Sequence, residues 1–258
     1  MRQNGQVAIV VLLISAIVMT VGLSVSKRTV VETKIDKDEE QLKQAFNTAE
    51  SGIEYYLKTS QTTYTASDLS SASVSTEAVG VGRTINLGGI VLDNETQLYW
   101  LVGHNDDGTI NYNAFYEGTV IDVCVNNNFA GALKIDYFYR NGGNYSVWRN
   151  GYNVANNNMV NGYTRVDPGA SNCIPGMKAV NIDTIPLSGN TPLLLAVRLI
   201  GWPSTNLVLR GDTDFPSQGE NITSTGKVGN GVSQVVKVFN RYRVPVYMID
   251  DITAYSVE

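Results

Sequence analysis

The chain offers few side chains for acid–base or metal chemistry, and they are scattered. His104 is the only histidine, so any histidine-based metal cluster or serine–histidine–aspartate relay would have to be built around it. It lies in GHNDDG, beside a predicted hairpin turn that also holds Asp106 and Asp107. Because adjacent residues in a turn usually point apart, we interpret these carboxylates as a solvated turn and not as a catalytic pair.

A second acidic pair, Asp212 and Asp214 in GDTDF, resembles one half of a calcium-binding loop. It lacks the full twelve-residue pattern of such loops, so both residues stay weak metal candidates. The glycines of GVGRTINLGG follow no strand–turn–helix context and do not predict a phosphate cradle. The sequence therefore predicts a protein that is not an enzyme and holds no cofactor.

Cys124 and Cys173 are the only two cysteines. They show neither a CxxC motif nor a cysteine–histidine spacing, so a metal site is not expected. In an oxidising compartment an even pair predicts one disulfide. Two unpaired core thiols are the alternative.

The composition favours an extracellular protein with a hydrogen-bonding surface. Net charge is −5, with no cluster of Lys and Arg along one segment, so nucleic acid is not a predicted partner. Charged residues make up only 17% of the chain, while Asn, Gly, Ser, Thr and Tyr are abundant. Such a surface is solvated through hydrogen bonds more than through ions.

The N-terminal quarter is the most informative part of the chain. Residues 1–5 (MRQNG) form a short polar leader, and residues 7–25 carry no charge. As a helix rising about 1.5 Å per residue, this apolar stretch is roughly 28 Å long, close to the hydrocarbon thickness of a membrane. A secretory signal usually has a shorter apolar core of about 7–15 residues.

Beyond Ser26 the sequence turns polar but keeps a helical period. One stripe recurs at steps of three, four or seven residues, which predicts a helix that packs this stripe against the following domain; it comprises Val31, Ile35, Leu42, Phe46, Ala49, Ile53 and Leu57. Since the first proline is Pro168, we expect one unbroken helix over residues 6–58, with at most a kink near Gly22.

This layout resembles type IV pilins and pseudopilins. The segment QLKQAFNTAESGIEYYL is similar to the "FxAAExG" signature of PilX-type minor pilins, a match carried by Gln44, Ala45, Phe46, Ala49, Glu50 and Gly52. The resemblance implies that a prepilin peptidase cuts between Gly5 and Gln6, leaving Gln6 as a methylated mature N-terminus. It also implies partners: copies of this chain or other pilins, the pilus assembly machinery, and the membrane before assembly.

One departure from the family concerns position 10. Most pilins carry a glutamate five residues after the cleavage point, whereas this chain has Val10. A buried carboxylate in lipid is costly unless it is paired, so its absence removes both a cost and a docking contact. Gly22 and Ser26 are small residues at i,i+4 that would let neighbouring helices approach closely.

After the helix, residues 59–82 are rich in Ser and Thr and are interpreted as a linker. Residues 83–258 are predicted to form an antiparallel, sandwich-like β-rich head, which makes the fold class α+β. The clearest strands are 119–125, 132–140, 192–200, 206–210 and 234–242. Hairpin turns are predicted at Asp107-Gly108, Gly142-Gly143, Asn150-Gly151 and Gly229–Asn230–Gly231. Residues 215–242, with ITSTG before VVKVF, are similar to the closing hairpin of several PilX-like proteins.

A run of aromatic residues in this head suits either glycan or subunit recognition or a half-buried sheet, and we favour the sheet: Tyr137, Phe138, Tyr139, Tyr145, Trp148, Tyr152 and Tyr163. The function that the sequence favours is a minor or major pilin in a filament at the cell surface. A membrane-anchored adhesin or binding module that does not polymerise is the first alternative, and an envelope hydrolase the second.

Overall fold

The computed structural model describes residues 4–105, 107–154, 160–166, 173–182, 189–229 and 231–245, with side chains from Ile9 onward. The chain divides into two compact units. Unit 1 comprises Met1–Ser75 and Thr223–Lys237, and unit 2 comprises Thr76–Ile222 and Val238–Glu258. One long N-terminal helix followed by antiparallel sheets confirms the predicted α+β class.

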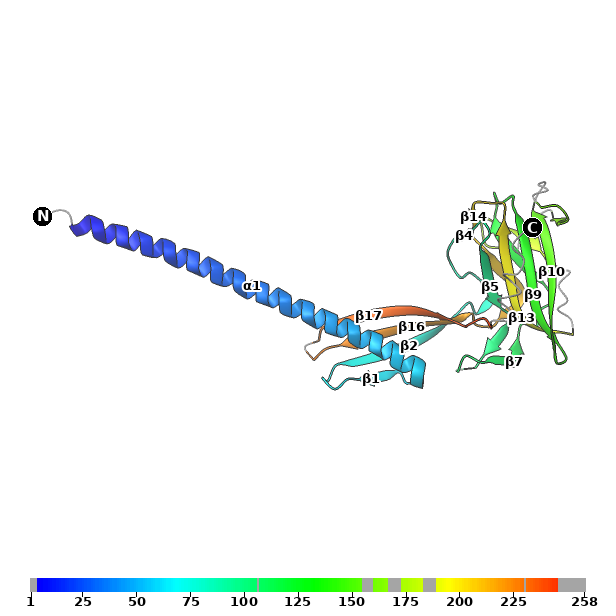
Figure 1. Ribbon diagram of the computed structural model, residues 1–258, viewed down its shortest axis with the longest axis horizontal. Coiled ribbons are helices and arrows are strands. Elements are labelled where there is room, and N and C mark those ends of the chain that lie inside the picture. Colours follow the sequence, from blue (N-terminus) through cyan, green and yellow to red (C-terminus); the bar gives the residue numbers. More distant parts are fainter. Residues whose placement is uncertain are drawn as a thin grey trace. The chain divides into compact units, whose positions relative to one another are not determined.

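The helix α1 (Asn4–Thr59) runs without interruption, as predicted (Figure 1). No proline removes a backbone donor, and Gly22 lies within the helix without breaking it. Hydroxyl groups in and beyond the apolar half donate to carbonyls one turn earlier, as in Ser15 to Val11 at 2.8 Å and Thr20 to Ala16 at 3.0 Å. These bonds satisfy the hydroxyl groups inside the helix itself, which suits apolar surroundings.

A four-stranded sheet lies beside the C-terminal half of α1 (Figure 1). Its order is β1-β2-β16-β17, formed by β1 (Thr63–Thr65), β2 (Ser71–Val79), β16 (Gly219–Lys227) and β17 (Ser233–Arg241). The expected linker at 59–82 therefore contains two strands. In β2 the side chains of Ala72 and Val74 are buried while their neighbours are more exposed, so the period is that of a strand even though Ser and Thr dominate the segment.

The helix packs closely on this sheet through small residues. Ala45 and Ala49 are fully buried, and a Cβ atom added to Gly226 of β16 would lie 2.1 Å from the carbonyl oxygen of Ala45. A Cβ atom added to Gly52 would lie 2.6 Å from Cβ of Ala72. Only glycine allows the backbones of helix and strand to approach this closely.

The packing stripe predicted from periodicity is mostly wrong. Ala49 and Ile53 are buried, but the other five members of the stripe stay about half exposed; they are Val31, Ile35, Leu42, Phe46 and Leu57. The buried face is instead rotated toward Ala45, Thr48 and Gly52. Bulky side chains would hold the helix away from the sheet, so the small residues form the contact.

Unit 2 contains two larger sheets. The first has the order β11-β10-β9-β13-β5 and the second β12-β8-β15-β3. Their strands are β3 (Gly82–Ile85), β5 (Thr96–Trp100), β8 (Ile121–Asn126), β9 (Ala132–Asn141), β10 (Asn144–Val154), β11 (Thr164–Val166), β12 (Met177–Asn181), β13 (Thr191–Ile200) and β15 (Val208–Phe215). Two short pairs complete the described strands: β4 (Val91–Leu92) with β14 (Ser204–Thr205), and β6 (Val102–His104) with β7 (Ile110–Phe115).

The two sheets of unit 2 share one core. Ile135 and Tyr137 from β9, and Val123 and Leu209 from β8 and β15, belong to a single buried cluster. Alternate residues of each strand point into this cluster, as expected for a sandwich. Pairing is antiparallel except between β10 and β11, which run parallel.

One predicted hairpin is wrong. Asn150-Gly151 lies inside β10, which pairs continuously with β9 from Asn144 to Asn153. The β9–β10 turn falls at Gly142-Gly143, as also predicted. Gly151 has a packing role instead, because a Cβ atom there would lie 2.4 Å from the ring of Tyr163. The Asp107-Gly108 turn joins β6 to β7 as predicted, with Gly108 at φ +79.

We predict that Gly226→Val loosens the contact between α1 and β16. The added side chain clashes with backbone, which cannot give way as a flexible side chain can, so unit 1 should lose about 1–3 kcal/mol. Hydrogen exchange of the amides around Ala45 and Ala49 in the full chain should accelerate. Gly229→Val is the matched control, because a Cβ atom at Gly229 meets nothing within 4 Å. Equal exchange in the two variants would contradict the packing role of Gly226.

Candidate functional site

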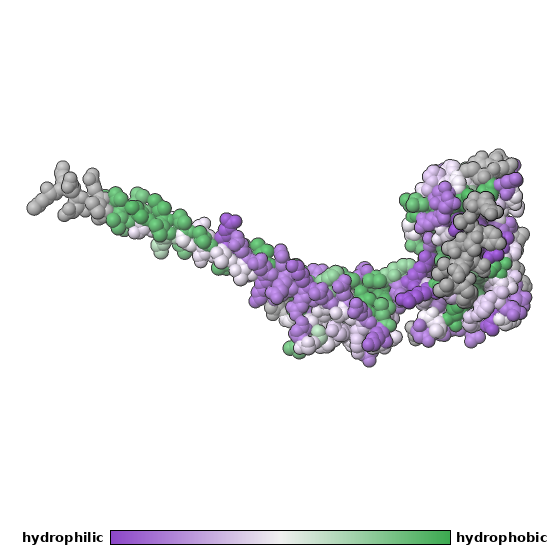
Figure 2. Space-filling model, viewed as in Figure 1, coloured by the Kyte–Doolittle hydropathy of each residue, from purple (hydrophilic) through white to green (hydrophobic). Residues whose placement is uncertain are grey.

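The N-terminal half of α1 is the most conspicuous unpartnered surface within the described residues. The helix is long and apolar enough to cross a membrane, and none of its most apolar window is buried within the chain. Figure 2 shows hydrophobic surface gathered along this half, after the residues drawn in grey and before the first charged residues. The segment is a candidate membrane anchor, although length and composition alone are weak evidence for one.

The residues that the sequence assigned to processing and assembly all lie on this helix. Gly5 and Gln6 are within its first turns, where only the backbone is described. Val10 is 55% exposed, and Gly22 has nothing within 4 Å of the position of an added Cβ atom. Ser26 is also exposed. Val10, Gly22 and Ser26 are therefore open to lipid or to a neighbouring helix.

The exposed apolar surface continues past the membrane-length segment. Ile35 is 52% exposed and Phe46 is 43% exposed, although charged residues surround both along the helix. The ion pair of Arg28 and Glu32, at 3.0 Å, lies about one to two turns before Ile35 and on the same side of the helix. Large apolar side chains in the second half of α1 are thus exposed among charged ones.

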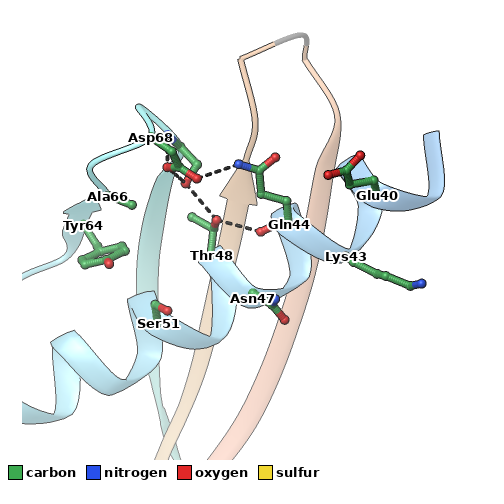
Figure 3. A pocket seen from close by; sticks show the side chains of 10 residues that line it. Glu40, Lys43, Gln44, Asn47, Thr48, Ser51, Tyr64, Ala66 and Asp68 are labelled. Atoms are coloured by element: carbon green, nitrogen blue, oxygen red, sulfur yellow. Dashed lines mark hydrogen bonds between the residues drawn. The ribbon is translucent and has the colours of Figure 1, made fainter. Parts of the chain in front are cut away.

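On its other flank α1 borders a polar pocket of about 470 Å³. It is lined by six polar side chains of the helix, by one residue of β1 and by three residues of the segment leading into β2 (Figure 3). The lining residues are Glu40, Lys43, Gln44, Asn47, Thr48, Ser51, Tyr64, Ala66, Asp68 and Ser70. The pocket could not be predicted from the sequence, since helix periodicity does not show which polar face the loop after β1 will cover.

Asp68 organises one wall of the pocket. Its carboxylate accepts hydrogen bonds from the hydroxyl and the backbone N–H of Ser70, at 2.6 and 3.0 Å, and from the amide of Gln44 at 2.6 Å. The buried Thr48 hydroxyl links Ser70 to the helix at 3.0 Å. The bonds from Ser70, followed by the one from Gln44, lower the pKa of Asp68 to about 2, so this carboxylate is ionised at neutral pH.

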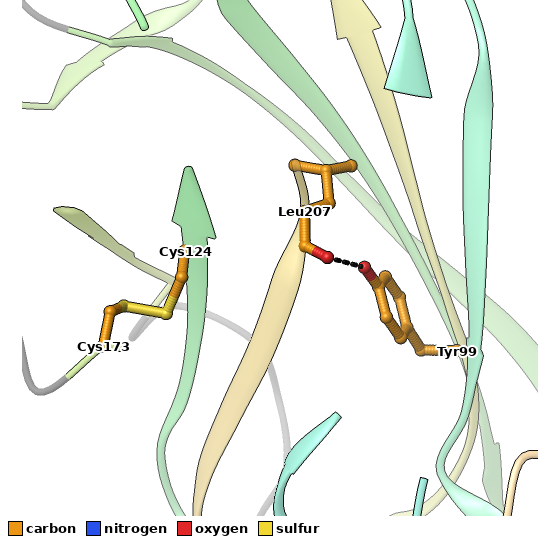
Figure 4. The surroundings of a disulfide bond; sticks show 4 residues. All are labelled: Tyr99, Cys124, Cys173 and Leu207. Carbon is orange, nitrogen blue, oxygen red and sulfur yellow. Dashed lines mark hydrogen bonds between the residues drawn. A yellow bond between two sulfur atoms is a disulfide. The ribbon is translucent and has the colours of Figure 1, made fainter. Parts of the chain in front are cut away.

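Cys124 and Cys173 form the disulfide that the sequence predicted (Figure 4). Cys124 is fully buried on β8 and packs with Met177 and Val208 in a small cluster. The bond spans a sequence separation of 49 residues, with the two Cα atoms 5.9 Å apart. It thereby ties the chain just before the edge strand β12 to the centre of its sheet.

The weak metal candidates lie in different environments. Asp212 accepts hydrogen bonds from the hydroxyl of Tyr116 at 2.6 Å and from the hydroxyl and N–H of Thr119 at 2.9 and 3.0 Å. Burial alone would raise its pKa, but these bonds hold the pKa well below its usual range. Asp214 is exposed and lies 3.9 Å from Arg83. Among the described residues no group of three or more His, Cys, Asp or Glu side chains is arranged for a metal ion.

His104 is a packing residue in the structure. Its ring stacks on Tyr242 with centroids 3.9 Å apart and meets the edge of Trp100 at 4.5 Å. Neither ring nitrogen has a hydrogen-bond partner among the described residues, and burial lowers the pKa of His104 to about 4. Asp107 caps its own turn by accepting from Thr109 at 2.6 Å, while Asp106 lies outside the described residues. No acid–base pair is assembled around His104 in the part of the chain that the structure describes.

Most members of the aromatic run belong to the core. Tyr137 and Tyr152 are buried in the main core of unit 2, against which Tyr139 and Trp148 also pack. Phe138 is buried in a second cluster, with Trp100. Tyr145 differs, being 52% exposed, with its hydroxyl 2.8 Å from that of Tyr112.

Comparisons with known proteins add little. No family model matches the chain, and no curated protein matches it. A solved structure described as "Crystal Structure of Thermotoga maritima 1070" is similar over 58% of this chain and 96% of its own, at 8% identity and a TM-score of 0.20. That score is too low to support any argument about fold or function. The architecture itself, a long apolar N-terminal helix followed by a β-rich head, is compatible with that of a pilin.

We predict that removing the disulfide destabilises unit 2. In the chain-entropy account, a closed loop of this length contributes about 4 kcal/mol. The double variant Cys124→Ala/Cys173→Ala should unfold at a lower urea concentration, followed by the fluorescence of the buried Trp100. Reductant should produce a similar shift in the native chain and none in the variant. A native chain that is insensitive to reductant, with both thiols recovered free after alkylation, would contradict the assignment.

We also predict that acid destabilises unit 2 through His104. Its folded pKa of about 4 lies below the ordinary 6.5, so the unfolded state binds the proton more readily. Stability contributed by the neutral ring is complete above pH 6.5 and falls as the pH drops toward 4, by about 1–3 kcal/mol. The measurement is the urea midpoint at pH 7 and at pH 4.5. His104→Phe retains a ring in the stack and should lose less stability on acidification; an equal loss would exclude His104 as the cause.

Proposed function

We propose that this chain is a structural subunit, minor or major, of a type IV pilus-like filament at the cell surface, assembled through α1. The observation that carries the proposal is the apolar stripe of α1, which stays exposed beyond the length that a membrane can cover. About 20 helical residues cross the hydrocarbon layer. Ile35, Leu42 and Phe46 lie past such a span and remain 42–52% exposed.

A single membrane anchor gives no reason for this continuation. In a lone anchor these side chains would meet water, and each fully covered side chain of this size is worth about 1.5–3 kcal/mol. The helices of neighbouring copies can cover these side chains. One continuous helix can therefore hold its first half in the membrane and later bring both halves into a bundle.

Under this proposal the N-terminal positions have specific roles. A prepilin peptidase removes residues 1–5 by cutting between Gly5 and Gln6. With Val10 in place of a carboxylate, the subunit docks without an ion pair to a neighbour's N-terminal amine, so packing around Gly22 and Ser26 matters more. Energy for assembly comes from an external ATPase, because the sequence carries no nucleotide-binding motif.

The second candidate is a membrane-anchored binding module that does not polymerise. The polar pocket beside α1 favours it, because a binding site at the cell surface needs only an anchor. The two candidates differ in what they require of α1: an anchor tolerates any apolar sequence of the right length, whereas a filament core depends on side-chain shape.

We predict that Ile35→Ser and Gly22→Leu leave membrane insertion intact and reduce assembly. Losing about 1.5 kcal/mol or more at a shared contact should lower the ratio of sheared-filament protein to membrane-fraction protein by about tenfold. For Gly22→Leu the cause is the loss of close helix approach. Ile90→Ser is the matched control, since Ile90 is 64% exposed but lies in unit 2.

Two outcomes would contradict the filament proposal. One is an unchanged ratio in both helix variants. The other is an unchanged ratio after residues 7–25 are replaced by an unrelated poly-leucine anchor. N-terminal mass analysis of protein extracted from the surface gives a separate check: a start at Gln6 supports a processed subunit, and an intact Met1 supports the anchored module.

A further inference from the structure

The pocket of unit 1 has the size and lining of a small-molecule site. Its volume of about 470 Å³ is within the range of roughly 300–1,000 Å³ that ligand pockets occupy. Its lining exposes polar and apolar surface in nearly equal parts. A solute that fits must therefore offer both hydrogen-bonding groups and apolar faces.

Several lining groups keep their hydrogen-bonding capacity. Asn47, Ser51 and Tyr64 line the pocket, and within the described residues their side chains are engaged in no hydrogen bond. Part of the lining is fixed, because Gln44, Thr48, Asp68 and Ser70 hold one another in place. The lining thus combines free donors and acceptors with a pre-formed polar cluster.

Tyr64 supplies the one aromatic surface of the lining. Its ring is half-buried and rests against Tyr55, with centroids 5.5 Å apart and planes at 50°. This support limits the positions that the ring can take. An aromatic face of this kind packs against the C–H face of a sugar ring, while amide and hydroxyl groups bond the ring's hydroxyls.

The charges of the lining argue against an anionic ligand. Glu40 and Asp68 are both acidic, and Asp68 stays ionised because its pKa is lowered to about 2 by its hydrogen bonds from Ser70 and Gln44. Lys43 is the single cationic member, and Figure 3 shows its side chain extending away from Asp68. A phosphate, sulfate or sialic acid would meet net negative charge.

We propose that this pocket binds a neutral saccharide unit, with Tyr64 against the sugar ring and with Asn47, Ser51 and Asp68 bonding its hydroxyls. The site lies wholly within unit 1 and does not depend on whether the chain polymerises. It would give the protein a glycan-recognition activity separate from any structural role.

The test is ligand-observed saturation-transfer NMR on the full chain in detergent micelles. The probes are galactose, N-acetylglucosamine and their β-linked disaccharide, with N-acetylneuraminic acid and N-acetyl-lysine amide as an anionic and a cationic comparison. We expect a neutral sugar to bind and N-acetylneuraminic acid to give no signal, because the lining carries net negative charge; the cationic probe shows whether that charge alone is enough to attract a ligand. Saturation confined to the charged probes, or absent for all, would overturn the proposal.

Variants separate the pocket from other surfaces. Tyr64→Ala and Asn47→Ala should each weaken sugar binding by about tenfold, the factor that corresponds to about 1.4 kcal/mol. Tyr145→Ala removes an exposed tyrosine of unit 2 and should bind like the native chain. Tyr64→Phe keeps the aromatic ring that contacts the sugar, so it should retain most of the binding. It also preserves the packing on Tyr55, so the role of the ring can be tested even if Tyr64→Ala misfolds. Unchanged binding in both alanine variants would place the sugar elsewhere and refute this site.

Discussion

The close approach of α1 to β2 and β16 is the contact on which the rest of unit 1 depends. Gly226 lies against the helix backbone at Ala45, and Gly52 lies against Ala72. Because these residues have little or no side chain, the helix axis sits low on the sheet. The helix residues that flank this contact are therefore not covered by the sheet. Polar ones on the side of β1 line the pocket, and large apolar ones such as Phe46 stay exposed. One packing choice thus produces both the pocket and the uncovered stripe.

The two halves of α1 have different side chains on one continuous backbone and suit different surroundings. Residues 7–25 carry no charge, and the hydroxyl groups of Ser15 and Thr20 there bond to carbonyls of the preceding turn, so these two groups do not need water. The second half of α1 carries many charges and is held to the sheet of unit 1 by small residues. The large apolar residues Ile35, Leu42 and Phe46 belong to neither arrangement. Their exposure is the physical reason to expect a partner for α1 beyond the membrane.

Patterns of period and residue type predicted the elements well and their contacts poorly. The missing prolines predicted one helix, the runs of β-branched residues predicted β8, β9, β13 and β17, and two cysteines predicted one disulfide. The packing face of α1 was assigned to its bulky residues because periodicity cannot show that a glycine on a distant strand, Gly226, lets the backbone come close. Asn150-Gly151 was assigned to a turn for the same reason, since the ring of Tyr163 that requires the glycine is remote in sequence. The polar pocket depends on where the loop after β1 falls, which no local pattern reveals.

The two segments that resemble pilin-like proteins also have a physical explanation in this contact. Ala45, Ala49 and Gly52 come from the helix signature, while Ser224 and Gly226 come from the ITSTG strand, and these small residues meet face to face. The two similar segments are therefore the two sides of one helix–strand contact, and together they are a single point of resemblance. Any protein that lays a helix this closely on a strand would need small residues at matching positions, whether or not it polymerises. The case for a filament accordingly rests on the uncovered stripe of α1, because that is the feature which packing within a single chain leaves unexplained.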